Sequence, residues 1–394
     1  MPLPPPTADE LAHSERLRAV IRAEIEARGP IDFERYMQLA LYAPGLGYYS
    51  AGAAKLGAAG DFVTAPELGA LYARTVARAI APVLRETRGE LVEIGAGSGA
   101  FAVDVLPALA ALDALPERYA IVEISADLRE RQRARIDERA PAYAARLVHL
   151  DAPPAVRWRG VLFANEVVDA LPVRRFVARR DGTLAALGVA CDAAGEFRGV
   201  ELPADAVLAA EVARREAEVA RALDHEGPVW QRPYRSEIVP GLPAWFAAVA
   251  GTLESGLALF IDYGYPRREY YLPERRDGTL ICHYRHRVHD DPFAHVGLSD
   301  ITASVDFTAL AEAGAAIGFE LGLYTSQAQF LIANGLTEIA AETPVADERE
   351  RILRTQEIRR LTLPGEMGER FKVMALTRGI GLPQRRAVDH SGRL

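Results

Sequence analysis

The chain has 394 residues, of which 49% are hydrophobic and 25% charged, a composition typical of globular proteins with a sizeable core. Its formal net charge of −8 provides no overall positive field that would attract nucleic acid or acidic lipid. The two cysteines are too few for a disulfide framework, and neither a signal peptide nor an apolar run of about 20 residues is visible. The sequence therefore predicts a cytoplasmic protein with no membrane span and no nucleic-acid partner.

Residues 1–85 are predicted to form a helical cap. A helix over 8–28 is ended by the breaker pair Gly29-Pro30, and residues 33–42 are apolar on one helical face. The many glycines and alanines of 50–64 predict a loop, and a further helix is expected over 66–86.

Short apolar strands then alternate with helices, which predicts a doubly wound α/β sheet with parallel strands. The expected strands are 91–94, 119–123, 146–150 and 160–164, with helices at 101–112 and 126–139 between them. This core is expected to comprise residues 86–173 and 243–380, including helices at 243–253 and 307–317 and strands at 257–262 and 371–377.

An insertion interrupts this core at 174–242, on the substrate side. Residues 174–202 are predicted to form an antiparallel meander, because turn signals occur at Asp181-Gly182 and Ala194-Gly195. Residues 203–224 are predicted to form a charged amphipathic helix. Residues 381–394 are expected to be a tail.

The most informative motif is Leu-Val-Glu-Ile-Gly-Ala-Gly-Ser-Gly-Ala at 91–100, which follows a strand and opens a helix. Gly95, Ala96 and Gly97 permit a tight turn and let a ligand approach the backbone. The pattern G-x-G-x-x-G/A also fits dinucleotides, so an NAD-binding oxidoreductase remains an alternative. A turn that merely packs a helix on a strand is a second alternative.

Three acids near the strand ends favour S-adenosylmethionine over a dinucleotide. Glu93 lies inside the strand before the glycines, where a carboxylate can orient the loop and bind the cofactor's ammonium. Glu123 ends the next strand and suits the two ribose hydroxyls, and Asp151 follows the third strand and suits the adenine amino group. Because ligands bind outside the carboxyl ends of such strands, the combination predicts a methyltransferase.

The fourth strand runs into Asn165, Glu166 and Asp169, which are carried past the cofactor edge of the sheet. Methyl transfer depends mainly on aligning the nucleophile, and two carboxylates can clamp a guanidinium through bidentate hydrogen bonds. We therefore take Glu166 and Asp169 as candidate catalytic residues and Asn165 as a cofactor contact. Alternatively, Asn165 caps a helix and Glu166 occupies its first turn.

Along nearly its whole length the sequence resembles the MidA family of S-adenosylmethionine-dependent methyltransferases. Besides the glycine loop, the resemblance rests on Ala164-Asn-Glu-Val-Val-Asp-Ala-Leu-Pro-Val-Arg-Arg-Phe176 and on the stretches 35–49, 60–67, 122–125, 261–265, 300–307 and 367–373. It implies a Rossmann-like methyltransferase sheet and a protein arginine N-methyltransferase, with a protein client bearing the target arginine. The family's mitochondrial members methylate a respiratory complex I subunit and assist its assembly. Within the resemblance, Asp61, Phe62 and Thr64 approach the cofactor from the cap.

Two departures from the family pattern leave the substrate open. The loop reads Gly95-Ala-Gly-Ser-Gly99 instead of Gly-Pro-Gly-Arg-Gly, and Val167-Val168 replaces a commoner Phe-Phe. A small-molecule methyltransferase and a cofactor-binding assembly factor without turnover are therefore alternatives.

Other polar and aromatic clusters are weaker signals. The spacing of His283, His286 and His289 matches no firm metal-ligand motif, so no metal site is predicted. Four tyrosines can wall a peptide groove, although packing is expected for at least half of them: Tyr36, Tyr42, Tyr48 and Tyr49.

Overall fold

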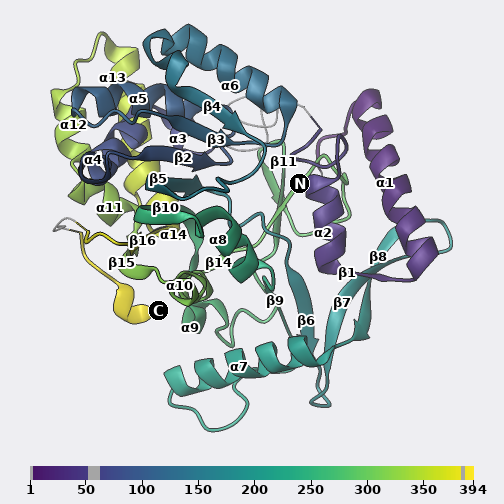
Figure 1. The fold of residues 1–394 in the computed structure, drawn as a ribbon. Helices are drawn as coiled ribbons and strands as arrows, with labels where there is room; N and C mark the ends of the chain where they lie inside the picture. The colour runs from purple at the N-terminus through teal and green to yellow at the C-terminus, as the bar shows by residue number, and fades with distance from the viewer. Residues whose placement is uncertain (1–2, 52–62, 383–386) are drawn as a thin grey trace.

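The computed structural model describes residues 3–51, 63–382 and 387–394. Its centre is a sheet in the order β15-β16-β10-β5-β2-β3-β4, with β14 paired to the end of β10 (Figure 1). The strands are β2 (Glu90–Ile94), β3 (Tyr119–Val122), β4 (Leu147–Leu150), β5 (Trp158–Asn165), β10 (Leu253–Tyr265), β14 (Val305–Asp306), β15 (Glu320–Ser326) and β16 (Phe371–Arg378).

The neighbouring strands β4, β3, β2, β5 and β10 are mutually parallel. Strand β16 runs antiparallel to both of its neighbours, β10 and β15. From β2 the chain proceeds to β3 and β4 on one side, whereas β5 and β10 lie on the other. The order therefore reverses between β2 and β5, which is where doubly wound sheets bind ligands. The predicted doubly wound α/β fold is confirmed.

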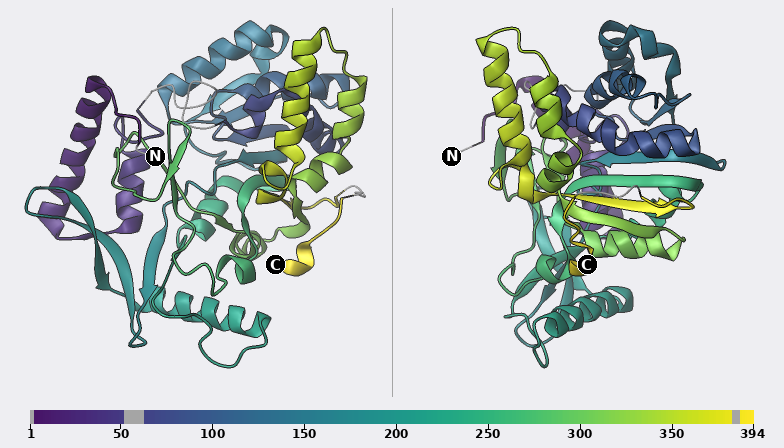
Figure 2. Two further views of the ribbon diagram at one scale, coloured as in Figure 1. Left: turned by 180° about the vertical axis from the view of Figure 1, so that it is seen from behind. Right: turned by 90° about the vertical axis from the view of Figure 1, so that its left-hand side faces the viewer.

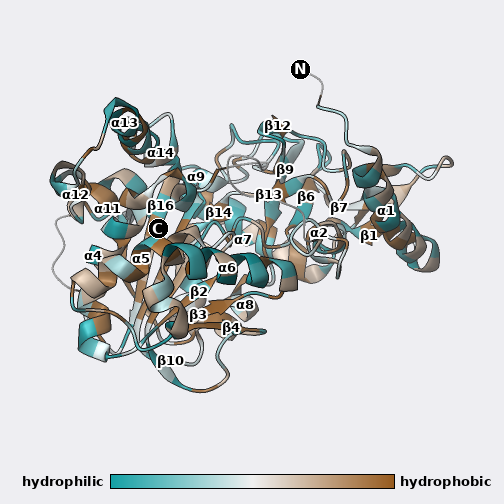
Figure 3. Ribbon diagram, turned by 90° about the horizontal axis from the view of Figure 1, so that it is seen from above, coloured by the Kyte–Doolittle hydropathy of each residue, from teal (hydrophilic) through white to brown (hydrophobic). Residues whose placement is uncertain are grey.

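Helices cover both faces of the sheet, as the right-hand view of Figure 2 shows. Alternation along β5 sends Val161 and Phe163 into one hydrophobic cluster and Leu162 and Ala164 into the other. The first face is covered by α4 (Ala70–Thr87), α5 (Ala100–Ala111), α6 (Ala126–Arg139), α11 (Gln327–Ala333), α12 (Leu336–Glu342) and α13 (Glu348–Thr362). The second is covered by α8 (Leu242–Ala250) and α10 (Phe307–Ala316). In Figure 3 the outer helices α6 and α13 are largely hydrophilic, whereas hydrophobic colour lies along the strands.

The predicted meander forms part of a second sheet, in the order β1-β7-β6-β9 with β8 on β7. Its strands are β1 (Ile31–Asp32), β6 (Arg174–Ala178), β7 (Leu184–Cys191), β8 (Phe197–Pro203) and β9 (Tyr234–Ile238). The helix predicted at 203–224 is α7 (Ala206–Ala222), which packs Leu208, Val212 and Val219 against this sheet. A short helix, α9 (Arg267–Tyr270), follows β10.

The N-terminal helices pack against the insertion. Both α1 (Ala8–Arg28) and α2 (Phe33–Tyr42) have the predicted bounds, and β1 between them pairs with β7 through Ile31 and Val189. A three-stranded sheet consists of β11 (Ile281–Tyr284), β12 (Arg287–His289) and β13 (Asp300–Thr302). Its residues Cys282 and Ile301 belong to the hydrophobic cluster that α1 and α2 form with β1 and β7. We propose that the cap comprises residues 3–51 together with the insertion at 174–242, because α4 packs in the main core instead.

The helix predicted at 66–86 is divided into α3 (Ala65–Leu68) and α4. Gly69 is extended, with φ 161° and ψ −176°, and the Glu357 carboxylate accepts a hydrogen bond from the Leu71 N–H at 2.8 Å. This carboxylate gives α4 a new N-terminus, an effect that depends on a residue 286 positions away. Most of the predicted 50–64 loop lies outside the described residues. Within the described part of the chain, no helix is long and apolar enough to cross a membrane.

Candidate active site

The glycine loop joins β2 to α5 with its glycines in the left-handed region. The φ angles are 66° at Gly95, 54° at Gly97 and 80° at Gly99. Side chains rarely adopt these angles, so the glycines are required by the turn itself. A Cβ on Gly95 would lie 3.1 Å from Cγ2 of Val167, which shows that the segment after β5 packs directly against the loop.

Glu123 lies immediately after β3, at the carboxyl edge beside the glycine loop. Its side chain is buried, and Oε1 accepts a hydrogen bond from the Ser125 N–H at 2.8 Å. Burial raises the pKa of the Glu123 carboxyl, although the hydrogen bond from Ser125 opposes the rise. A fixed carboxylate at this edge is suited to accept hydrogen bonds from a pair of vicinal hydroxyls.

Asp151 follows β4 on the same edge, with its side chain 90% exposed. Its Oδ1 pairs with Nη2 of Arg129 at 2.5 Å, and Nε of Arg129 donates to the Glu123 carbonyl at 2.5 Å. Arg129 therefore ties the ends of β3 and β4 together. Prediction from strand ends alone did not single out this arginine.

Glu93 points into the protein core. Its carboxylate is buried and accepts a hydrogen bond from the Tyr119 hydroxyl at 2.5 Å. Burial raises the pKa of Glu93 to about 7, against the opposing effect of the Tyr119 hydrogen bond. In this arrangement Glu93 supports the strand that leads into the glycine loop.

The segment before α4 reaches the glycine loop through Glu67. The Ser98 hydroxyl donates to the Glu67 carboxylate, and Nη1 of Arg135 donates to the same oxygen at 3.1 Å. Thr64 is the N-cap residue of α3 and thus lies next to this contact. The predicted contacts Asp61 and Phe62 lie outside the described residues. The Glu67 carboxylate therefore links α3 to the glycine loop and to α6.

Asn165 ends β5 and is held from two sides. Its side-chain oxygen accepts a hydrogen bond from the Tyr72 hydroxyl, and its amide nitrogen donates to Oε1 of Glu166 at 3.0 Å. The residue therefore orients Glu166 and does not cap a helix, because residues 166–173 contain none. The alternative of a helix start after β5 is wrong.

Residues 166–169 form a turn that is held by Asp262, a residue to which the sequence assigned no role. Oδ2 of Asp262 accepts hydrogen bonds from three successive backbone N–H groups, those of Val167, Val168 and Asp169, at 3.2, 3.0 and 3.2 Å. Oδ1 accepts a fourth, from the Tyr263 N–H at 2.9 Å. The turn holds Glu166 at φ 54°, a conformation that costs free energy for a residue with a side chain.

The turn concentrates negative charge in a buried place. Burial raises the pKa of Glu166 to about 8, and the neighbouring Asp169 adds to the rise, opposed by hydrogen bonds from Asn165 and the Ala65 backbone. Burial also raises the pKa of Asp169 to about 6, against the effect of the Tyr263 hydroxyl. Burial and the carboxylates of Asp169 and Glu166 raise the pKa of Asp262 above its usual range.

Within the described ranges, none of these three carboxylates forms an ion pair with arginine or lysine. Buried charges in proteins are normally compensated by a partner. The site is thus electrostatically complementary to a cation.

Tyrosines of the cap border the same turn. The Tyr42 hydroxyl donates to the Ala170 carbonyl at 2.9 Å, and the Tyr49 hydroxyl donates to both oxygens of Asp300, at 2.9 and 3.0 Å. The two rings stack with centroids 5.6 Å apart. By contrast, Tyr36 and Tyr48 are fully buried in the cap core, as expected for half of these tyrosines.

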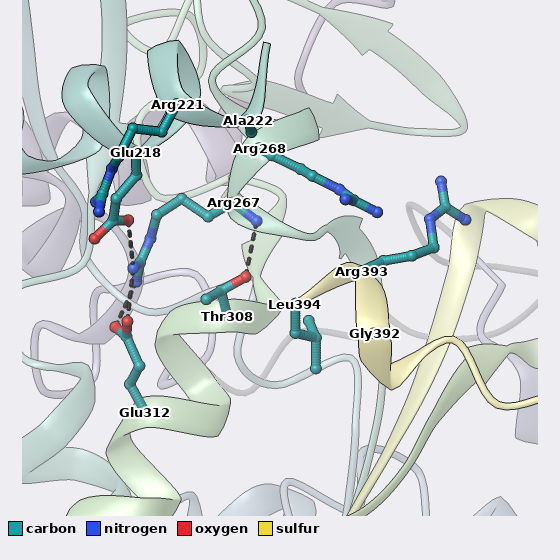
Figure 4. A pocket seen from close by; sticks show the side chains of 10 residues that line it. All are labelled: Glu218, Arg221, Ala222, Arg267, Arg268, Thr308, Glu312, Gly392, Arg393 and Leu394. Atoms are coloured by element: carbon teal, nitrogen blue, oxygen red, sulfur yellow. Dashed lines mark hydrogen bonds and ion pairs between the residues drawn. The ribbon is translucent and has the colours of Figure 1, made fainter. Parts of the chain in front are cut away.

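The histidines of 283–289 lie on the β11–β12 hairpin, His283 and His289 within its strands. In the described ranges no three His, Cys, Asp or Glu residues lie close enough to hold a metal ion. A separate cavity of about 360 Å³ lies between α7, α10 and the chain end (Figure 4). Its buried Arg267 pairs with Glu218 at 2.8 Å and with Glu312 at 2.6 Å, so the central charges of this cavity compensate one another.

A doubly wound sheet with a glycine loop and acids at successive strand ends defines the class of α/β proteins that bind a cofactor containing a nucleoside. A family model described as "Putative S-adenosyl-L-methionine-dependent methyltransferase" matches residues 75–325, more than half of the chain. The chain belongs to this family: it is a methyltransferase with S-adenosylmethionine as cofactor.

Solved structures agree with this assignment. A Burkholderia thailandensis protein described as a "likely methyl transferase" and bound to S-adenosyl-homocysteine is 43% identical, with a TM-score of 0.92 and full coverage of both chains. A native structure from the same organism, also 43% identical and fully covered, has a TM-score of 0.88. The prediction of S-adenosylmethionine in place of NAD is confirmed.

Curated relatives carry a more specific name. "Protein arginine methyltransferase NDUFAF7, mitochondrial" of Danio rerio is 26% identical over 94% of this chain and 89% of its own length. The protein of the same name from Homo sapiens is 26% identical over 90% of this chain and 81% of its own length. These relatives confirm the family resemblance found in the sequence.

Proposed function

We propose that the protein transfers the methyl group of S-adenosylmethionine to an arginine guanidinium of a protein client. The observation that carries this proposal is the pair of enclosed carboxylates, Glu166 and Asp169, which have no cationic partner among the described residues. A guanidinium is planar, permanently charged and able to donate several hydrogen bonds, so it complements two neighbouring carboxylates better than an ammonium does. The names of the curated relatives support the same substrate class.

The cofactor is proposed to lie at the carboxyl edge of β2, β3, β4 and β5. Glu123 would accept the ribose hydroxyls and Asp151 the adenine amino group, while Glu93 and Asn165 support the loop and the turn. The remaining proposed contacts are Gly95, Ala96, Gly97 and Thr64, together with Asp61 and Phe62 outside the described ranges. When bound, S-adenosylmethionine supplies an electrophilic methyl group.

The acidic turn has two tasks in this proposal. Glu166 and Asp169 orient the guanidinium so that one nitrogen faces the cofactor edge, and one of these carboxylates holds the proton that this nitrogen loses. A carboxylate with a raised pKa is a better proton acceptor than one in water, so the buried site suits the second task. Asn165, which donates to Oε1 of Glu166, keeps this carboxylate in place.

Binding of small probes tests the substrate class without knowledge of the client. In the presence of S-adenosyl-homocysteine, Nα-acetylarginine amide should bind at least about tenfold more tightly than the uncharged citrulline analogue, because a charge-assisted bidentate pair is lost. The variants Glu166→Gln and Asp169→Asn should abolish this difference, whereas Glu201→Gln on the exposed face of β8 should preserve it. Equal binding of both probes would contradict the guanidinium site.

The client itself requires a labelling experiment. Purified protein and methyl-labelled cofactor would be incubated with native lysate, and the label would then be located by mass spectrometry. Label on an arginine of a protein, such as a complex I-type subunit, supports the proposal. Label in a metabolite supports a small-molecule methyltransferase, and cofactor binding without any transfer supports an assembly factor.

A further inference from the structure

A fully buried amide connects two parts of the proposed cofactor site. Gln132 lies on α6 with no exposed surface. Its Nε2 donates a hydrogen bond to the Gly97 carbonyl in the glycine loop at 2.9 Å, and it reaches Oε2 of Glu123 at 3.4 Å. A single side chain thus contacts both the loop and the acid at the end of β3.

The orientation of this amide follows from its neighbours. The Gly97 carbonyl and the Glu123 carboxylate can only accept hydrogen bonds, so the NH₂ end of Gln132 faces them. Oε1 faces Nε2 of His149 at 2.9 Å, which requires that the His149 ring carries its proton on Nε2. Burial, with Arg133 and Arg129 nearby, lowers the pKa of His149 and thereby favours the neutral ring.

The glycine loop also packs against the backbone of this residue. A Cβ on Gly99 would lie 3.3 Å from Cγ of Gln132 and 3.4 Å from its Cα. The loop is therefore in direct contact with α6 at Gln132, and an amide without partners would be costly in so buried a place.

We propose that Gln132 is a positioning residue for the cofactor ribose. Ser125 holds one oxygen of the Glu123 carboxylate and Gln132 holds the other, so the plane of the carboxylate is fixed relative to the glycine loop. A carboxylate with a fixed plane can accept both hydroxyls of one ribose without the entropic cost of ordering its own side chain. His149 acts indirectly, because its hydrogen bond fixes the orientation of the Gln132 amide. The inference rests on the proposed role of Glu123 as the ribose acceptor.

Calorimetry with two cofactor analogues tests this role. S-adenosyl-homocysteine carries both ribose hydroxyls, whereas its 2′,3′-dideoxy analogue lacks them. Gln132→Met keeps the length of the side chain and removes its donors. We expect this variant to lower the affinity for S-adenosyl-homocysteine by about tenfold or more and the affinity for the dideoxy analogue by less than about threefold. Gln356→Met, on the exposed face of α13, is the matched control and should change neither affinity.

A merely structural role predicts another result, because a distorted loop weakens both analogues equally. Equal losses, or no loss, would overturn the inference. The variant Glu123→Gln tests the ribose assignment separately. If Glu123 accepts the ribose hydroxyls, this variant must lose more affinity for S-adenosyl-homocysteine than for the dideoxy analogue. If Glu123→Gln distinguishes them and Gln132→Met does not, only the role of Gln132 is wrong. If Gln132→Met does not fold, His149→Phe leaves the amide present but unoriented, and it should show the same preference to a smaller extent.

Discussion

At the scale of single residues, the site depends on carboxyl groups whose protonation the fold has altered. Glu166 and Asp169 have pKa values raised to about 8 and about 6, mainly by burial, so at neutral pH part of their negative charge is neutralised by bound protons. A cation entering the site favours the ionised forms and so releases these protons. Binding of a guanidinium and loss of a proton are therefore linked.

This linkage predicts that affinity for Nα-acetylarginine amide rises between pH 6 and pH 8 and levels off above the pKa of Glu166. The guanidinium stays charged throughout, so the rise reports the carboxyls, by at most about tenfold per pH unit for each proton released. Groups facing Glu166 from the packed elements are Asp169, Asp262, Asp300 and Tyr72. Titration calorimetry at several pH values would measure this rise in affinity. The variant Glu166→Gln should lack the part of the rise that occurs near pH 8. Constant affinity from pH 6 to pH 8.5 would contradict the linkage.

Glu93 gives a second prediction, concerning stability. Its pKa is about 7 in the folded protein and 4.5 as a reference, so the folded state binds the proton more tightly than the unfolded state. The raised pKa therefore makes the free energy of unfolding fall as pH increases from about 4.5 to 7. Glu93→Gln imitates the protonated form and still accepts from Tyr119. The free energy of unfolding of this variant should therefore rise relative to that of the natural protein between pH 5 and pH 8.5, by up to about 3 kcal/mol. Urea unfolding without cofactor would measure it, and a pH-independent difference would show that Glu93 ionises freely.

At the scale of elements, the acidic turn after β5 is shaped by its neighbour β10. The turn residues make few hydrogen bonds to one another, and their N–H groups converge instead on the carboxylate of Asp262. The Asp169 carbonyl accepts from the Ala303 N–H at 2.9 Å, which ties the turn to the segment before β14. The positions of Glu166 and Asp169 thus depend on β10 and on the segment between β13 and β14, both outside the motif that contains these two residues.

Replacement of Asp262 should therefore disturb the turn more than the cofactor site. Asp262→Ala removes the acceptor of four backbone N–H groups, the three of the turn and that of Tyr263. It should lower the free energy of unfolding by at least about 1–3 kcal/mol and weaken the binding of Nα-acetylarginine amide by about tenfold. Asp262→Asn keeps one acceptor oxygen but turns its NH₂ toward the Tyr263 N–H, so we expect a smaller loss. Affinity for S-adenosyl-homocysteine should stay within about threefold in both variants. A loss confined to the cofactor, with the arginine probe unaffected, would be inconsistent with this role.

At the scale of the whole molecule, the sheet and the cap perform different tasks. The parallel strands place the proposed cofactor contacts at one edge, because their carboxyl ends meet there. From the cap, Tyr42 reaches the Ala170 carbonyl at the end of the acidic turn, and Tyr49, stacked on Tyr42, contacts Asp300. The substrate site that we propose therefore lies between the sheet and the cap.

Ligand binding should stabilise the entire fold by mass action. S-adenosyl-homocysteine at about 100 times its Kd adds about 2.7 kcal/mol to the free energy of unfolding, which corresponds to a rise in Tm of several degrees. NAD at the same concentration should leave Tm unchanged. Thermal unfolding with each ligand would measure the shifts, and a shift with NAD alone would contradict the cofactor assignment.

The sequence by itself determined those features that depend on local spacing. The helices α1, α2 and α6 have their predicted bounds, since their caps and apolar faces are local signals. The alternation of strands and helices gave the fold class, and the glycine loop with Glu123 and Asp151 gave the cofactor class. The helix predicted at 66–86 was not divided at Gly69, because the carboxylate that caps α4 belongs to a distant helix.

Only the tertiary structure decided which buried groups meet. Asp262 and Asp169 are 93 positions apart, and Tyr49 and Asp300 are 251 apart, so no spacing rule connects them. The buried partners Tyr119 and Gln132 are equally invisible to pattern analysis, because a core tyrosine or a helical glutamine has no distinctive neighbours in sequence. Burial then sets the protonation of Glu93 and Glu166, since desolvation depends on everything packed around a carboxyl and not on the residues beside it in the chain.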